Sequence, residues 1–140
     1  MSADYQVQAI YSDLDSGMNR DKQGALKVVT DATSVEQSID TILLTPLGSR
    51  VFLRDFGSRL HELVFEPSTI ETTLRIRNEI ERAITTWDPR LVIISVNVEI
   101  MESDGVSIPS GADNNQLLVT IEGYIQGLNN FSYSKVLTRD

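Results

Sequence analysis

The residues of this chain that could carry catalysis are its single histidine and its carboxylates. His61 lies beside Glu62, and the 140 residues include no cysteine. The sequence contains neither the HExxH pattern of zinc hydrolases nor the GxSxG turn that presents a nucleophilic serine. A metal centre or a Ser-His-Asp triad would need His61 without a supporting motif, so we interpret His61 as a solvent-facing or partly packed side chain. The glycines are scattered turn residues rather than a phosphate-binding loop, and we expect no cofactor.

Pairs of carboxylates could perform glycoside hydrolysis, which needs one carboxylic acid with a raised pKa and one ionised carboxylate. The candidates are Asp55, Glu62, Glu66 and Asp88. Their abundance makes the signal weak, because any chain with 20 acidic residues offers such pairs. Sugar-binding clefts tend to be lined with aromatic side chains, and this chain has one tryptophan. The sequence therefore predicts a protein that is not an enzyme, with a small acidic muramidase as the alternative.

The charge of the chain disfavours nucleic acid and anionic membrane as partners. The formal net charge is −8 and the pI is near 4.6, whereas binding to phosphates needs clustered Lys and Arg. No apolar run approaches the roughly 20 residues that span a membrane. Only Lys22, Lys27 and Lys135 are lysines among the 12 basic residues. Arginine suits protein interfaces better than lysine does, although a compositional bias of the lineage would give the same count.

Helices are expected in the first part of the chain after a polar, turn-rich arm at residues 1–30. We expect this arm to be extended or partly disordered, with residues 1 to about 25 mobile in the free protein and ordered only against neighbouring proteins. A first helix should begin near Ser34, whose spacing to Gln37 fits a capping box, and Pro46 should end it. A short helix through residues 60–64 and a third helix from Ser68, with Glu71 as its capping-box partner, should follow.

Strands are expected in the rest of the chain. Apolar and polar residues alternate along 91–101, where Ile94, Val96, Val98 and Ile100 should share one face, and along 116–126. A third strand is predicted at 131–137, and a Ser-, Gly- and Asn-rich loop at 103–115. Helices first and strands last predict an α+β fold, with the helices packed on one face of a small antiparallel sheet in the C-terminal half. We expect residues 31–140 to form a single domain.

The run Asp88-Pro89-Arg90 stands where the third helix must turn into the first long strand. Proline fixes φ and ends a helix, so the flanking acidic and basic side chains project from a stiff corner. The spacing allows two interpretations, a docking site for another protein or a salt-bridge corner inside the domain.

Three turn motifs and this corner together give the chain a family resemblance. The run TPLGSR at residues 45–50 is followed by Phe56-Gly57, then by Phe65-Glu66-Pro67, and finally by Asp88-Pro89-Arg90. In this order and spacing they resemble the baseplate wedge family of contractile-tailed bacteriophages, which is shared with type VI secretion and extracellular contractile injection baseplates. The family has Glu-Pro-Arg at the corner, and this sequence has the shorter Asp88 there.

The resemblance implies a structural protein of the virion, located in the tail baseplate and assembled in the host cytoplasm. It implies that the corner residues Asp88, Pro89 and Arg90 engage neighbouring wedge proteins. It also implies that the C-terminal strands, with Phe131, Tyr133 and Lys135, accept strands from the first ring of tail sheath. Tail tube or hub proteins are further expected partners. A baseplate component of a secretion or injection system is the alternative within this class.

Overall fold

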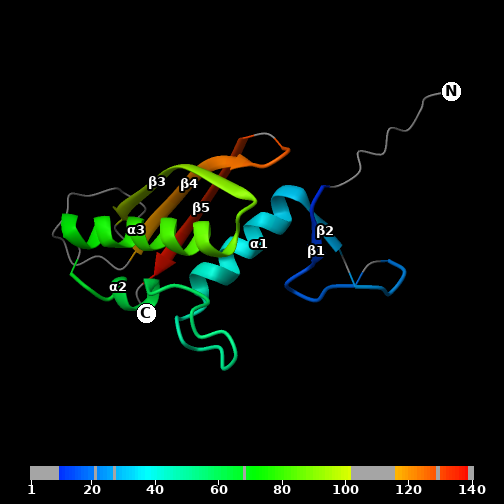
Figure 1. Ribbon diagram of the computed structural model, residues 1–140, viewed down its shortest axis with the longest axis horizontal. Helices are drawn as coiled ribbons and strands as arrows, with labels where there is room; N and C mark the ends of the chain where they lie inside the picture. Colours follow the sequence, from blue (N-terminus) through cyan, green and yellow to red (C-terminus); the bar gives the residue numbers. More distant parts are fainter. Residues whose placement is uncertain are drawn as a thin grey trace.

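The computed structural model describes residues 10–20, 22–26, 28–67, 69–101, 116–128 and 130–138. In Figure 1 the helices lie on one side of the sheet β3–β4–β5, and the small hairpin β1–β2 lies beyond one end of α1. The fold is α+β, as the sequence predicts. The elements in chain order are β1 Ser12–Leu14, β2 Val28–Thr30, α1 Asp31–Leu44, α2 Leu60–Leu63, α3 Ile70–Trp87, β3 Leu91–Met101, β4 Gln116–Ile125 and β5 Asn130–Thr138.

The large sheet is antiparallel, in the order β3–β4–β5. Along β4, side chains are alternately buried and more exposed, because successive residues of a strand point to opposite faces. The buried face packs against α1, α2 and α3 in a single apolar core. The core side chains that are almost free of solvent include Val35, Ile39, Ile76, Ile80, Ile84, Val119 and Ile121. None of the helices in the described ranges has the length and hydropathy needed to cross a membrane.

A β-bulge in β3 interrupts the alternation of inward and outward side chains that was predicted for that strand. The register with β4 shifts between Ile93 and Ser95, so Ile94 is the extra residue of the bulged strand. Ile93 packs against the core, whereas Ile94 is 69% exposed and does not share the face of Val96 as predicted. The side chain of Ile100, the loop predicted at 103–115 and residues 1–9 lie outside the described part of the chain.

The start of α1 differs from the prediction. The helix begins at Asp31 with Thr30 as its N-cap, and Ser34 is a fully buried residue inside the helix. Asp31 adopts a φ of 51°, a left-handed conformation that Asp tolerates better than most residues. Its carboxylate accepts from the backbone N–H groups of Ile10, at 3.0 Å, and Tyr11. Strand β2 therefore runs directly into α1, which leaves no place for a capping box at Ser34.

Proline ends α1 as predicted, and α3 starts close to its predicted position. The residue before Pro46 is extended, and its backbone N–H still bonds the carbonyl of Thr41. The N-cap of α3 is Thr69, whose hydroxyl accepts from the backbone N–H of Thr72 at 3.2 Å. Ser68, the predicted cap, lies outside the described residues.

Strands β1 and β2 form a short antiparallel hairpin within the region expected to be an extended arm. Tyr11 attaches it to the body of the protein. The hydroxyl of Tyr11 donates to the carbonyl of Gln126 at 3.0 Å, and its carbonyl accepts from the backbone N–H of Asp31 at 2.8 Å. The guanidinium carbon of Arg90 lies 5.5 Å from the centroid of the Tyr11 ring. Ordering of the arm against a neighbouring protein stays a prediction.

Candidate assembly interfaces

The corner after α3 is built around an ion pair between Asp88 and Arg90. One terminal nitrogen of Arg90 lies 2.7 Å from Oδ2 of Asp88, and its Nε lies 2.8 Å from Oδ1. A second terminal nitrogen donates to the hydroxyl of Ser34 at 3.2 Å. The Asp88 side chain is 1% exposed and that of Arg90 is 25% exposed. Asp88 and Arg90 therefore form a two-point pair that is closed inside the domain, while Arg90 keeps a partly accessible edge.

The ion pair determines the protonation state of the corner. Burial raises the pKa of Asp88, but the hydrogen bonds from Arg90 and Ser38 and the Arg90 charge outweigh it and lower the pKa below its ordinary value. The hydrogen bond to Asp88 is the largest cause that raises the pKa of Arg90. Both groups are thus held in their charged forms. The shorter side chain of Asp, compared with the Glu of the family pattern, reaches Arg90 across a single proline.

The three predicted residues of β5 lie on the helix-facing side of the sheet. Phe131 and Tyr133 are buried, and Lys135 is partly buried. The hydroxyl of Tyr133 donates to Asp40 on α1, and Nζ of Lys135 lies 2.9 Å from the same carboxylate oxygen. Their side chains thus attach β5 to α1. Any contact that β5 makes with another chain would use its backbone edge and its outer side chains, such as Val136, which is exposed.

The two edges of the large sheet differ in regularity. Among the strands of the described residues, β3 and β5 each have one neighbour in this sheet. The register of β5 with β4 runs without a shift from Gln116↔Thr138 to Tyr124↔Asn130. The register of β3 with β4 is interrupted at its bulge. Bulges twist an edge and disturb the pairing of a further strand, so β5 is the edge better suited to strand addition.

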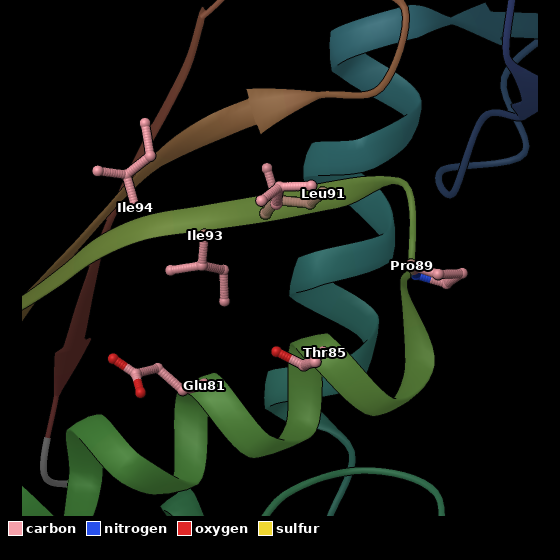
Figure 2. Close-up of a pocket in the computed structure, with 7 residues that line it drawn as sticks. Glu81, Thr85, Pro89, Leu91, Ile93 and Ile94 are labelled. Atoms are coloured by element: carbon pink, nitrogen blue, oxygen red, sulfur yellow. The ribbon is translucent and has the colours of Figure 1, made fainter.

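A hollow of about 580 Å³ separates α3 from the bulged half of β3. In Figure 2, Glu81 and Thr85 face the strand from α3, and Ile93 points down into the space between strand and helix. Ile94 points to the other side of the strand, as expected for the extra residue of a bulge. The lining is mainly aliphatic with one carboxylate, and it contains no pair of groups suited to acid–base catalysis.

The residues that could have carried catalysis make ordinary contacts with neighbouring side chains. His61 is exposed on α2, with Nε2 3.8 Å from Glu62. Of the candidate carboxylates, Asp88 is paired with Arg90, and Glu66 lies 3.6 Å from Arg75. Within the ranges that the structure describes, no group of three His, Cys, Asp or Glu side chains could hold a metal ion.

Sequence reasoning missed two residues that build these sites. Ser34 was interpreted as a helix cap, yet its hydroxyl accepts a hydrogen bond from Arg90. Asp40 received no role, although it links α1 to β5. The one local signal for Asp40 is its place beside Ile39 and Ile42, on the border of the apolar face of α1. A carboxylate at such a border is positioned to reach a polar group of the element packed against the helix.

The chain belongs to a known family. Residues 29–130 match the family described as baseplate wedge protein gp25. The sequence is 42% identical over 80 residues to baseplate protein W of Escherichia phage P2, a match that covers 57% of this chain and 67% of the relative. It is 32% identical over 92 residues to baseplate wedge protein gp25 of Enterobacteria phage T4, which covers 66% of this chain and 70% of the relative.

Solved structures share the fold. A crystal structure from Geobacter sulfurreducens, which bears a provisional tail-lysozyme name, aligns with a TM-score of 0.65 and 28% identity over 81% of this chain and 96% of its own. A chain in the baseplate of the anti-feeding prophage aligns with a TM-score of 0.62 and 16% identity, covering 93% of this chain and 86% of its own. At that identity the second likeness shows the fold alone.

Family membership confirms the resemblance deduced from the turn motifs. The chain is a structural wedge protein of a contractile phage tail and belongs to the tail baseplate of a virion. The prediction that it is not an enzyme is confirmed by the structural role in which these relatives are named. The functional residues predicted at the corner and on β5 remain predictions.

Proposed function

We propose that this protein joins neighbouring wedge proteins through the Asp88-Pro89-Arg90 corner and templates the first ring of tail sheath by strand addition at β5. Wedge proteins and tail sheath are the proposed partners. The observation that carries this proposal is the uninterrupted, nine-residue strand β5 with one neighbour among the described strands. A strand that docks there would gain main-chain hydrogen bonds, while its alternate side chains would set the register.

The attachment of β5 to α1 supports this role. Asp40 binds Tyr133 and Lys135 on the inner face, so the strand is fixed before a partner arrives. A preformed edge binds with a smaller entropy loss than a strand that must first order. Phe131 fills the core beside them, so the inner face of β5 supports the edge rather than contacting the sheath.

Proline substitutions test the edge. Of two successive residues in an antiparallel edge strand, one N–H bonds the neighbouring strand and the other points to the free edge. We would therefore compare Lys135→Pro with Val136→Pro, and use Lys135→Ala to account for the lost ion pair with Asp40. One of the two prolines should replace the residue whose N–H points to the free edge, and it should leave the stability of the domain unchanged, apart from any ion-pair loss that Lys135→Ala measures. Baseplates with that variant should contain this protein but lack sheath. Full-length sheaths in electron micrographs of that variant would exclude β5 as the template.

The corner needs a separate test because the Asp88–Arg90 pair also supports the fold. Arg90→Ala removes both the internal pair and the accessible edge of the guanidinium, whereas Ser34→Ala removes one internal hydrogen bond at a fully buried position. If the corner is an interface, Arg90→Ala should weaken wedge assembly by more than its loss of stability explains, and Ser34→Ala should not. Equal assembly by folded Arg90→Ala and wild type would show that the corner is purely internal.

A further inference from the structure

The loop at residues 46–57, between α1 and α2, carries an apolar tip that the proposed function does not use. Its tip residues Val51, Phe52 and Leu53 are all exposed, and the side chain of Phe52 is 100% exposed. Figure 1 shows the loop, drawn in blue-green after α1, projecting away from the sheet. It is therefore separate from the β5 edge.

The base of this loop is closed by backbone hydrogen bonds. Leu47 N–H donates to the carbonyl of Ser58 at 3.1 Å, and Ser58 N–H donates to the carbonyl of Thr45 at 3.0 Å. The buried hydroxyl of Ser58 donates to the carbonyl of Leu43 at 2.7 Å. Nearer the tip, Gly48 N–H donates to the carbonyl of Arg54 at 2.8 Å. These bonds tie both ends of the loop to the end of α1.

Aromatic contacts fix one side of the loop as well. Phe56 meets Trp87 of α3 edge-on, with ring centroids 5.1 Å apart. The guanidinium carbon of Arg50 lies 4.0 Å from the centroid of the Phe56 ring. Such a geometry is a favourable cation–π contact. Phe52 is thus carried on a preorganised support, and binding through it would not require the loop to order first.

The tip is locally basic in an acidic protein. Arg50 and Arg54 flank Val51–Leu53, and neither is in an ion pair among the described residues. The neighbouring acid, Asp55, lines a hollow with Arg59 and Arg82 near α3. Arg50 and Arg54 thus place positive charge beside an exposed aromatic side chain, in a chain whose net charge is −8.

We propose that the tip Val51–Leu53 is a docking knob that inserts Phe52 into an apolar pocket rimmed by carboxylates on another protein of the baseplate. Aromatic and arginine side chains dominate the energetic centres of protein interfaces. A rigid, fully solvated phenylalanine gains most when such a pocket removes it from water. Opposite charges at the rim would orient the two proteins.

Substitution tests the knob. Phe52→Ser and Arg54→Glu should leave the thermal midpoint unchanged, because exposed side chains contribute little to the fold. In competition with wild type for incorporation into baseplates, each should be reduced at least about tenfold. The control is Phe65→Ser, which alters an exposed phenylalanine outside the loop and should compete normally. Normal incorporation of folded Phe52→Ser would overturn the proposal.

A photo-cross-linker identifies the occupant. Benzoylphenylalanine in place of Phe52 should, in assembled baseplates, give one dominant adduct with a different protein, at a site of apolar residues bordered by Asp or Glu. Adducts with a second copy of this chain, adducts with lipid, or no adduct would each overturn the knob. Absence of the wild-type chain from baseplates would instead overturn the proposed wedge function, so the two failures are distinguishable.

Discussion

The hydroxyl of Tyr133 on β5 donates a hydrogen bond to the carboxylate of Asp40 on α1, 93 positions earlier in the chain. Lys135 binds the same oxygen, so one carboxylate holds two successive inward side chains of the strand. Burial, followed by the hydrogen bond and charge of Asp40, raises the pKa of Tyr133 well above its ordinary value. The hydroxyl therefore remains a donor at alkaline pH values where exposed tyrosines ionise.

Removing Asp40 should destabilise the domain measurably. Asp40→Ala leaves the partly buried groups of Tyr133 and Lys135 without their acceptor, and the free energy of unfolding should fall by about 1–3 kcal/mol. Urea denaturation measures this. The control is Glu71→Ala, which breaks the exposed 2.6 Å pair with Arg75 on α3 and should cost no more than about 0.5 kcal/mol. Equal losses would show that Asp40 does not support β5.

The Asp88–Arg90 pair should make stability depend on acid pH. The pKa of Asp88 is lowered from its ordinary value of 3.8, so its stabilising effect is fully present above that pH. It is lost as the pH falls further, through the folded-state pKa. Asp88→Asn should lower the free energy of unfolding by about 3 kcal/mol at neutral pH, because it leaves a partly buried arginine unpaired. The difference between variant and wild type should shrink at pH values below 3.8. A difference of the same size in neutral and strongly acidic urea titrations would contradict the assignment.

Two glycines of the 46–57 loop should differ in their tolerance of alanine. Both have positive φ, 82° at Gly48 and 107° at Gly57, so alanine is strained at either position. A Cβ at Gly48 meets no atom within 4 Å, whereas one at Gly57 would lie 2.2 Å from the carbonyl oxygen of Thr45. Gly48→Ala should cost about 1–2 kcal/mol, and Gly57→Ala about 3 kcal/mol or more. Thermal unfolding of the two variants compares them directly. Equal losses of stability would mean that the backbone at the base of the loop shifts to accommodate the Cβ at position 57.

Tyr11 should control local opening of the β1–β2 hairpin. Tyr11→Phe removes the bond to the Gln126 carbonyl, worth about 1 kcal/mol or roughly fivefold in amide exchange. Tyr11→Ala also removes the ring beside Arg90, and exchange at Ser12–Leu14 should rise further. Hydrogen-exchange mass spectrometry of the free protein measures both. Unchanged exchange at Ser12–Leu14 in both variants would contradict this role of Tyr11.

The ends of the helices were more predictable than their beginnings. Pro46 and Pro89 follow helices because a proline cannot donate the next hydrogen bond, which is a covalent constraint readable from the sequence. Caps depend on which of several suitable residues the tertiary structure selects. Ser34 had the right spacing for a cap, but the helix already begins at Asp31, directly after β2. Ser34 is instead buried inside the helix, where its hydroxyl accepts a hydrogen bond from Arg90.

The sheet was predictable as a pattern of faces but not in its irregularities. Alternation located all three strands closely, since burial of one face imposes it. It could not reveal the bulge, because Ile93 and Ile94 are both apolar and either fits the inward position. The Asp88–Arg90 pair was one of two interpretations that spacing allowed, and the structure shows the internal pair. The link from Asp40 to Tyr133 joins distant segments, and the place of Asp40 at the border of the apolar face of α1 does not identify its partner.

The bulge of β3 has a consequence for the polarity of growth. A sheet that can be extended equally from both margins has no preferred direction, and an assembly nucleated on it could propagate either way. Here one margin is continuous and the other is broken at Ile94. If β5 templates the sheath as proposed above, this protein offers one competent edge, and we expect polymerisation to proceed in a single direction from it.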